Sequence, residues 1–277
     1  MTDESSRPLS PLAEPAAWDR VASGYETDIA PVFEDYAREA LRIAGVRPGM
    51  SVVDVATGPG TLAALATKAG AQVSAIDFSE EMIALLHQRI NDEGLTGITA
   101  LVGDGMALPF ADASFDAGFS MFGIMFFPDR AKGFAELRRV LRPGAKAVVS
   151  SWVPMTRVPL MIATFGFLGE QFPDLMPSKP LPPVLSDAES CRAEMTAAGF
   201  ADVQVIEHTA SFAVPSMAVL VASFMRSNAV VAGLAHRAGD RWHGTEDKLL
   251  SRLVEQFGPG EQAMSMTALI TSGARPI

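Results

Sequence analysis

The sequence predicts an α/β fold in which helices cover both faces of a doubly wound sheet. A β-branched run at residues 52–55 suits a buried strand of a parallel sheet. A glycine-rich turn, an apolar helical segment and a second strand, residues 71–76, follow it directly. Strand-like and helical segments continue to alternate up to Trp152. We therefore expect a seven-stranded sheet with helical cap insertions beyond that residue.

The chain begins with a segment that precedes the sheet. Residues 1–15 are polar and rich in proline, and we expect them to be disordered. A helical region follows, from Trp18 through Val32 to Ala44. It lies ahead of the first strand and so has no position in the sheet. One reading is that Trp18 and Tyr25 simply pin this region to the core.

Glycines interrupt the chain immediately after the first strand. Gly58, Pro59 and Gly60 force a tight loop, and Thr61 is a candidate N-cap for an apolar helix over residues 62–69. This order of strand, turn and helix lets the backbone lie close to a ligand. It also aims free N–H groups of the helix at that ligand.

An acidic residue ends the second strand. Asp77 follows the glycines by about 20 residues, where a carboxylate can accept hydrogen bonds from ribose hydroxyls. With the glycine loop it forms one βαβ nucleoside-binding half. The alternative is a strand-to-helix loop that binds nothing.

The loop leaves the kind of nucleoside open. Residues 58–63 fit the dinucleotide pattern G-x-G-x-x-G/A. Pro59, however, removes a backbone N–H where a pyrophosphate needs donors. Asp54 places a carboxylate just before the loop, which repels phosphate and suits an ammonium or sulfonium group.

Later elements continue the alternation. Ser79 and Asp129 are candidate N-caps of two further helices. The helices are expected over residues 80–93 and 129–141, and the strands over 98–102, 117–121 and 145–152.

The pattern breaks after Trp152. Prolines recur through residues 153–185 around an uncharged stretch, residues 158–169. This is too long for an ordinary connection, and we interpret it as a cap over the substrate side. Residues 186–277 then supply the rest of the sheet and a helical insertion. Their expected elements are helices over 186–198, 215–238 and 245–257 and strands over 203–213 and 264–272.

An apolar stretch, residues 121–128, ends the fourth strand. The carboxyl end of such a strand faces the ligand crevice, so Phe122, Met125, Phe126 and Phe127 are candidates to wall a substrate pocket. The alternative is plain core packing. The uncharged cap segments, residues 158–169 and 217–225, are expected to meet these residues around an apolar or aromatic ligand. A competing reading assigns the same surface to a homodimer interface or a peripheral membrane contact.

Composition narrows the classes of partner. The formal charge is −10 and the isoelectric point about 4.9, which disfavours DNA or RNA as a partner. No signal-peptide core and no apolar run of ~18 residues is present, so we expect a soluble, cytoplasmic protein without a transmembrane segment. No His, Cys, Asp and Glu grouping has the spacing of metal ligands.

Four motifs in order resemble one enzyme family. Residues 53–60, Val-Asp-Val-Ala-Thr-Gly-Pro-Gly, resemble the first motif of the class I S-adenosylmethionine (SAM) methyltransferases. Later stretches are similar to the rest of the series: residues 75–77, 103–110 with 115–116, and 137–144. The spacing is similar to that of the ubiquinone/menaquinone-biosynthesis (type 11) branch, and the resemblance covers roughly residues 15–152. Ala56 departs from it, since the family usually has glycine there. We expect this change to be tolerated because Gly58 and Gly60 remain.

The resemblance implies a layout for the chain. It implies a Rossmann-like sheet whose last strand is antiparallel and inserts beside the fifth. Residues 16–45 would fold over the ligands as a lid, and residues 46–152 would form the SAM-binding core. Asp104 would bond the adenine amino group and Gly105 would offer a backbone N–H. The implied cofactor contacts are Tyr25, Asp54, Ala56, Gly58, Gly60, Asp77, Phe78, Met82, Asp104, Gly105, Met106 and Ser120.

The expected activity is methyl transfer from SAM to the O, N or C atom of a small molecule. The rivals are an NAD(P)-dependent oxidoreductase and a SAM-binding protein without transferase activity. A sulfonium methyl group is activated by the cofactor itself, so a missing catalytic signature is compatible with transfer. His208 and His243 are weak candidates for a base that deprotonates a phenol or enol.

Overall fold

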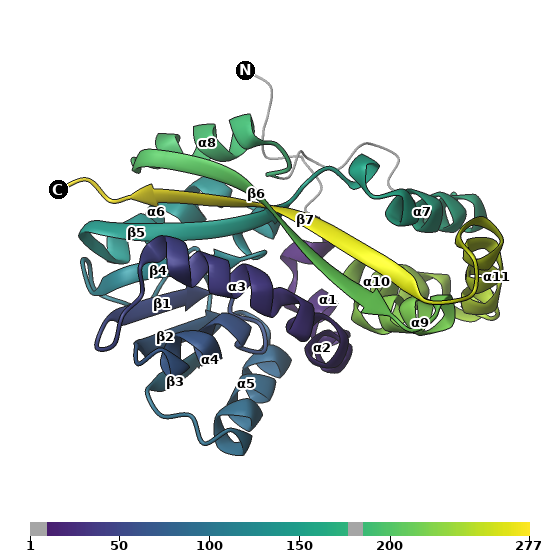
Figure 1. Cartoon of the computed structure of the whole chain (residues 1–277), viewed down its shortest axis with the longest axis horizontal. Coiled ribbons are helices and arrows are strands. Elements are labelled where there is room, and N and C mark those ends of the chain that lie inside the picture. The colour runs from purple at the N-terminus through teal and green to yellow at the C-terminus, as the bar shows by residue number, and fades with distance from the viewer. Residues whose placement is uncertain (1–9, 177–184) are drawn as a thin grey trace.

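The computed structural model describes residues 10–176 and 185–277, and a seven-stranded sheet forms its centre (Figure 1). The strand order is β3-β2-β1-β4-β5-β7-β6. β7 pairs antiparallel with both β5 and β6, and the other pairs are parallel. The predicted fold class and the antiparallel last strand are confirmed. The strands are β1 Ser51–Val55, β2 Gln72–Asp77, β3 Ile98–Val102, β4 Phe115–Met121, β5 Leu141–Trp152, β6 Ala201–Val214 and β7 Gln262–Ala274.

Helices lie on both faces of this sheet. One face carries an apolar cluster that includes Leu62 and Leu86, and the other face carries one that includes Leu137 and Met195. The helices are α1 Pro15–Asp19, α2 Ala22–Gly24, α3 Ala30–Ala44, α4 Thr61–Lys68, α5 Glu80–Asp92, α6 Arg130–Val140, α7 Pro159–Gln171, α8 Ala188–Ala197, α9 Met217–Ser227, α10 Ala229–Ala238 and α11 Thr245–Phe257.

Strand order places the ligand crevice. β1 pairs with β2 on one side and with β4 on the other, so the chain reverses its direction of winding between β1 and β4. Loops that leave the carboxyl ends of two such strands diverge to opposite faces and leave a crevice between them.

Local side-chain chemistry fixes several helix starts. The hydroxyl of Ser79 accepts the Met82 N–H at 3.1 Å, and the carboxylate of Asp129 accepts the Lys132 N–H at 2.9 Å. Both predicted caps are confirmed. Thr61 is not a cap, because Gly60 takes the N-cap position with a left-handed φ of 79° and Thr61 is the first helical residue.

Short helical turns make up the N-terminal segment over residues 10–29. Residues 10–15 were expected to be disordered, but they begin a short helical turn that Ser10 caps through the Leu12 N–H. The indole of Trp18 fastens this turn by donating to the Leu12 carbonyl at 2.9 Å. Residues 1–9, also expected to be disordered, lie outside the described residues. The predicted single helix is broken into α1, α2, a π-helical turn over Tyr25–Ile29, and α3.

The remaining helices form a cap at one end of a long ribbon. β6 and β7 pair from Ala201 and Ala274 out to Val214 and Gln262, and α9, α10 and α11 are inserted between them. Figure 1 shows α7 beside these helices, away from the parallel strands. We call α7, α9, α10 and α11 the helical cap. Residues 177–184 of the expected insertion lie outside the described residues.

The helical cap has its own apolar cluster. Leu168 of α7, Met217 of α9, Leu234 of α10 and Leu249 of α11 are all buried in it. The expected helix over 215–238 is divided at Asn228, whose side chain caps α10. No single helix within the described ranges is long and apolar enough to cross a membrane. By length and composition, α9 and the stretch Ala229–Trp242 pass that test together, with a bend of 77° between them.

Candidate functional site

A cavity opens at the carboxyl ends of β1, β2 and β4. Its empty volume is about 720 Å³ with the open mouth included. It lies at the crevice that the strand order predicts. The lining residues are Leu12, Ala13, Trp18, Tyr25, Ala56, Gly58, Asp77, Phe78, Met82, Gly103, Asp104, Gly105, Met106, Met121, Phe122, Gly123, Phe126, Phe127 and Pro128.

The two loop glycines have different tasks. Gly58 adopts a left-handed φ of 55° and lines the cavity, with no atom within 4 Å of the position that a Cβ would take. Gly60 does not line it. A Cβ on Gly60 would lie 2.2 Å from Cδ1 of Leu86, so glycine at this position lets α4 and α5 pack together.

Asp77 ties the loop to the end of β2. One carboxylate oxygen accepts the Gly58 N–H at 2.8 Å and the other accepts the Ser79 N–H at 3.0 Å. The side chain is buried, and desolvation raises the pKa of Asp77 to about 6 against the opposing effect of these hydrogen bonds. The carboxylate lines the cavity and keeps further lone pairs for a ligand.

Asp54 lies behind the loop, outside the cavity lining. Its Oδ2 accepts the Thr57 hydroxyl at 2.6 Å, whereas its buried Oδ1 has no hydrogen-bond partner among the described residues. Burial, with a smaller contribution from the charge of Asp77, raises the pKa of Asp54 to about 7. The acidic group therefore contributes negative potential beneath the loop and no direct contact.

Backbone strain marks the same edge of the sheet. Ala56 follows β1 and Phe122 follows β4, with left-handed φ values of 56° and 57°. Residues other than glycine rarely adopt such values. The Cβ of Ala56 lies 2.4 Å from the place of a Cβ on Gly123, so Gly123 makes room for the methyl group that Ala56 carries. Two strained residues beside one cavity are typical of a functional site.

An aromatic wall faces the acidic end. The rings of Trp18 and Phe126 lie 5.4 Å apart, and those of Trp18 and Tyr25 lie 6.2 Å apart. Phe122 extends this wall and stacks on Trp152 behind it. Burial and the charge of Asp77 raise the pKa of Tyr25, so its phenol stays neutral at pH 7.

The segment that was predicted to be a lid, residues 16–45, is held on two sides. The Ser79 hydroxyl donates to Asp19 at 2.5 Å on the side of the cavity. On the other side, Arg226 of α9 donates to both oxygens of Asp28, at 3.0 and 3.1 Å. A Cβ on Gly24 would lie 2.5 Å from the Arg226 carbonyl oxygen. The lid therefore connects the cavity to the helical cap.

Most predicted cofactor residues lie together around this cavity. The lining includes Tyr25, Ala56, Gly58, Asp77, Phe78, Met82, Asp104, Gly105 and Met106. It does not include Asp54, Gly60 or Ser120. The hydroxyl of buried Ser120 instead accepts the Ile124 N–H at 3.1 Å and supports the loop after β4.

The predicted substrate residues are divided. Phe122, Phe126 and Phe127 line the cavity, whereas Met125 is buried in the core behind them. The cap segments 158–169 and 217–225 were expected to line it too. They pack in one apolar cluster of the helical cap instead, where the rings of Phe165 and Phe224 lie 6.0 Å apart.

Neither predicted histidine reaches the cavity. His208 lies on β6, with Nε2 2.6 Å from Asp35, and His243 is exposed beyond α10. Of the described residues that line the cavity, none is basic. Within residues 10–176 and 185–277, no group of three or more His, Cys, Asp and Glu side chains could hold a metal ion.

Several lining residues were missed from the sequence. Leu12 and Ala13 lie in the segment that was expected to be disordered because it is polar and rich in proline. Gly103, Met121, Gly123 and Pro128 directly adjoin predicted residues, so strand-end position was the available signal.

The polar groups at the cavity suit a nucleoside that carries a positive charge. Asp77 and Asp104 supply carboxylates, Gly58 leaves open backbone, and the orphaned oxygen of Asp54 adds negative potential. A pyrophosphate would find these charges repulsive and no basic partner in the described lining.

A family model described as a methyltransferase domain matches residues 53–149. An uncharacterized protein of Mycobacterium tuberculosis is 37% identical over 137 residues, which are 50% of this chain and 46% of that protein. The match thus spans just under half of that relative's length.

Two further proteins are similar over more of their length. The ubiquinone/menaquinone biosynthesis C-methyltransferase UbiE of Geobacter sulfurreducens is 33% identical over 181 residues, 60% of this chain and 71% of that protein. A phosphoethanolamine N-methyltransferase of Haemonchus contortus, solved with phosphomonomethylethanolamine and S-adenosylhomocysteine, superposes with a TM-score of 0.60 at 19% identity. That superposition covers 97% of this chain and 61% of the other, and it bears on the fold alone.

Proposed function

Since the chain belongs to the class I SAM-dependent methyltransferases, we propose that it transfers the methyl group of SAM to a small, apolar or aromatic acceptor. Membership confirms the family that the motifs predicted and the cofactor that this family uses. The turnover, the acceptor and the individual contacts belong to the proposal.

The cavity residues would divide the cofactor between them. When bound, SAM supplies a methyl group that its sulfonium centre makes electrophilic. Asp77 accepts hydrogen bonds from the ribose hydroxyls, and Asp104 accepts one from the adenine amino group. Gly58 lets the backbone approach the methionine part, and the negative potential of Asp54 and Asp77 favours a cationic ligand.

The aromatic wall is the observation that carries the acceptor proposal. Trp18, Tyr25, Phe122 and Phe126 present ring surfaces, and the described lining holds no cation that could pair with a carboxylate or phosphate. A neutral ring or apolar chain would bury its surface there without an unpaired charge. The described lining holds no histidine either, which suits an acceptor atom that is already nucleophilic. The chain's part is then to position the acceptor and exclude water.

Two rival functions and several partner predictions stand beside this proposal. An NAD(P)-dependent oxidoreductase would need donors for a pyrophosphate, which Pro59 and the acidic lining disfavour. A SAM-binding protein without turnover would share the whole site. The cytoplasmic location, the absence of a nucleic-acid partner and the homodimer stay predictions.

Calorimetric titration with SAM, S-adenosylhomocysteine and NAD tests the cofactor. We expect the first two to bind and NAD not to; binding of NAD alone would refute the proposal. Turnover of labelled SAM against matched phenols, amines and their carboxylated or phosphorylated analogues tests the acceptor. We expect transfer to the uncharged members. Binding without any transfer would favour the rival without turnover.

A further inference from the structure

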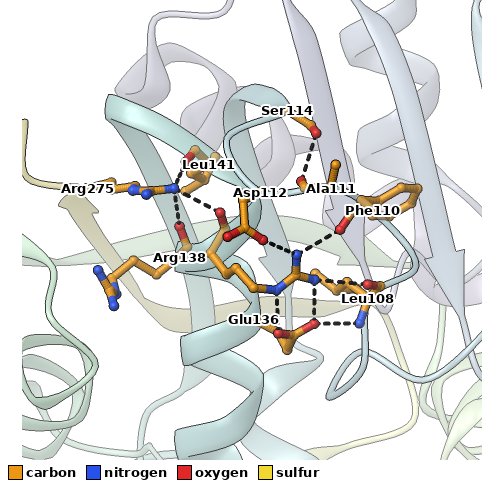
Figure 2. Close-up of polar contacts among 10 residues, drawn as sticks. Leu108, Phe110, Ala111, Asp112, Ser114, Glu136, Arg138, Leu141 and Arg275 are labelled. Carbon is orange, nitrogen blue, oxygen red and sulfur yellow. Dashed lines mark hydrogen bonds and ion pairs between the residues drawn. The ribbon is translucent and has the colours of Figure 1, made fainter.

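Arg139 at the end of α6 fastens the loop that follows β3. Its Nε and Nη2 donate to the two Glu136 carboxylate oxygens at 2.7 and 2.8 Å. Nη2 also donates to the Leu108 carbonyl at 3.0 Å, and Nη1 donates to the Phe110 carbonyl at 2.8 Å and to Asp112 at 2.7 Å. Figure 2 shows these contacts converging on one guanidinium group.

Glu136 and the helix backbone complete the attachment. The Glu136 carboxylate accepts the Leu108 N–H at 2.8 Å, so both polar backbone groups of Leu108 are bound by this pair of side chains. The Ala113 and Ser114 N–H groups donate to the carbonyls of Arg139 and Val140 at 3.1 and 2.8 Å. Hydrogen bonds from α6 thus hold the loop from Leu108 to Ser114.

The same loop begins in the cavity. Asp104, Gly105 and Met106 line it, and Leu108 is buried two residues further on. Asp104 accepts the Met106 N–H at 2.7 Å, which orients its carboxylate. The Ala107 N–H also donates to the Asp104 carbonyl at 3.0 Å, so a short hydrogen-bonded turn joins Leu108 to the acidic group that the cavity presents.

The last turn of α6 is itself held from elsewhere. The Arg275 guanidinium, just beyond β7, donates to the Arg139 carbonyl at 2.8 Å and to the Leu141 carbonyl (Figure 2). The residue that follows β7 thus supports the turn that carries Arg139.

We propose that Arg139, together with Glu136, is a positioning unit for the adenine end of the cofactor site. It touches no ligand and acts through the loop over residues 104–112. The proposal rests on the proposed function, which places the adenine amino group against Asp104.

The test compares two nucleosides that differ at one group. S-adenosylhomocysteine carries the adenine amino group, and S-inosylhomocysteine carries an oxygen in its place. Wild type should bind the first about tenfold more tightly, since one hydrogen bond to a charged group distinguishes them. In Arg139→Lys, affinity for S-adenosylhomocysteine should fall about tenfold. The ratio between the two ligands should fall to about threefold or less.

Two further variants separate positioning from stability. Glu136→Gln should reduce the ratio as well, and it serves as the test if Arg139→Lys does not fold. Glu194→Gln is the matched control. Glu194 of α8 accepts two hydrogen bonds from Arg130, at 2.8 and 2.6 Å, and Arg130 lies on α6 as Arg139 does. This pair does not touch the loop. It should lower the melting temperature and leave the ratio unchanged.

Three outcomes would overturn the inference. If wild type binds neither nucleoside, the proposed function fails and the inference fails with it. If wild type binds both equally, the loop makes no adenine contact. If wild type discriminates and the Arg139 and Glu136 variants discriminate equally well, the cofactor assignment stands and the positioning unit does not.

Discussion

Asp77 is a buried acid whose charge depends on pH near neutrality. Its pKa of about 6 means that the carboxyl group is half protonated at that pH. Only the ionised form can accept on all of its lone pairs. Its place at the end of the second strand could be read from the sequence, whereas its titration could not, because desolvation depends on which segments cover it.

We expect SAM to bind more tightly as pH rises from 5 to 7.5, because Asp77 loses its proton over this interval. At pH 7.5, Asp77→Asn should weaken binding by about 1.5–3 kcal/mol, roughly ten- to a hundredfold. It should also reduce the pH dependence, and the part that remains belongs to Asp54, whose pKa is about 7. Titration calorimetry at several pH values measures both effects. Asp92→Asn, exposed at the end of α5, is the control, and a wild-type affinity independent of pH would contradict the prediction.

Asp54 gives a separate prediction about the unliganded protein. Its pKa is raised from an ordinary 3.8 to about 7, so the folded state holds a proton that the unfolded state has released. The free energy of unfolding should therefore decrease as pH rises from 4 to 7. Asp54→Asn should remove this decrease in the free energy of unfolding. The decrease amounts to about 1.4 kcal/mol for each unit by which folding raises the pKa of Asp54.

Urea unfolding of the Asp54 variant checks the sign. Near pH 4 the neutral side chains of the two proteins should give similar free energies of unfolding, and at pH 7 the variant should be the more stable. A variant that is less stable than wild type at pH 7 would show that the buried charge is compensated.

At the scale of elements, prediction succeeded where the cause was local. Ser79 and Asp129 cap helices through N–H groups three residues away, and the sequence contains both partners. The breaks around Gly24 have a distant cause, since the chain there passes against the backbone of Arg226. Nothing in residues 16–45 indicates that contact.

Gly24→Ala should therefore detach the lid from α9. Its Cβ would lie 2.5 Å from a backbone oxygen, so one of the two segments must move. We expect faster amide exchange across residues 15–29, faster proteolysis in this segment, and weaker SAM binding because Trp18 and Tyr25 leave the cavity. The neighbouring exposed Ser23→Ala should behave like wild type. Equal exchange in the two variants would contradict the role of this contact.

At the scale of the whole molecule, the chain has two packed parts. One is the sheet, with an apolar cluster on each face, and the other is the helical cap with its own cluster. The doubly wound sheet could be predicted from the alternation of strands and helices, and its antiparallel last strand from the resemblance of the four motifs to a known family. The partners of the cap segments could not. Residues 158–169 and 217–225 are uncharged, which indicates burial without saying against what, and they proved to bury one another.

Leu249→Ala and Leu137→Ala should show that the helical cap and the sheet lose protection independently. Both side chains are fully buried, the first in the helical cap and the second beneath the sheet. Each truncation should cost about 2–5 kcal/mol. Hydrogen exchange should accelerate mainly in α7, α9 and α11 for the first variant and mainly in β1, β4 and β5 for the second. Acceleration everywhere in both variants would show one cooperative unit.

The pairing at the outer end of the ribbon bears on how such a chain can diverge. Val214 and Gln262 are direct partners, so the segment between them leaves and re-enters the sheet at one point. Insertions and deletions in a segment whose ends already meet leave the strand register untouched. The family model likewise stops at residue 149, before this segment begins. Most of the helical cap is therefore one contiguous segment that can change in length without altering the sheet on which the nucleoside half of the molecule is built.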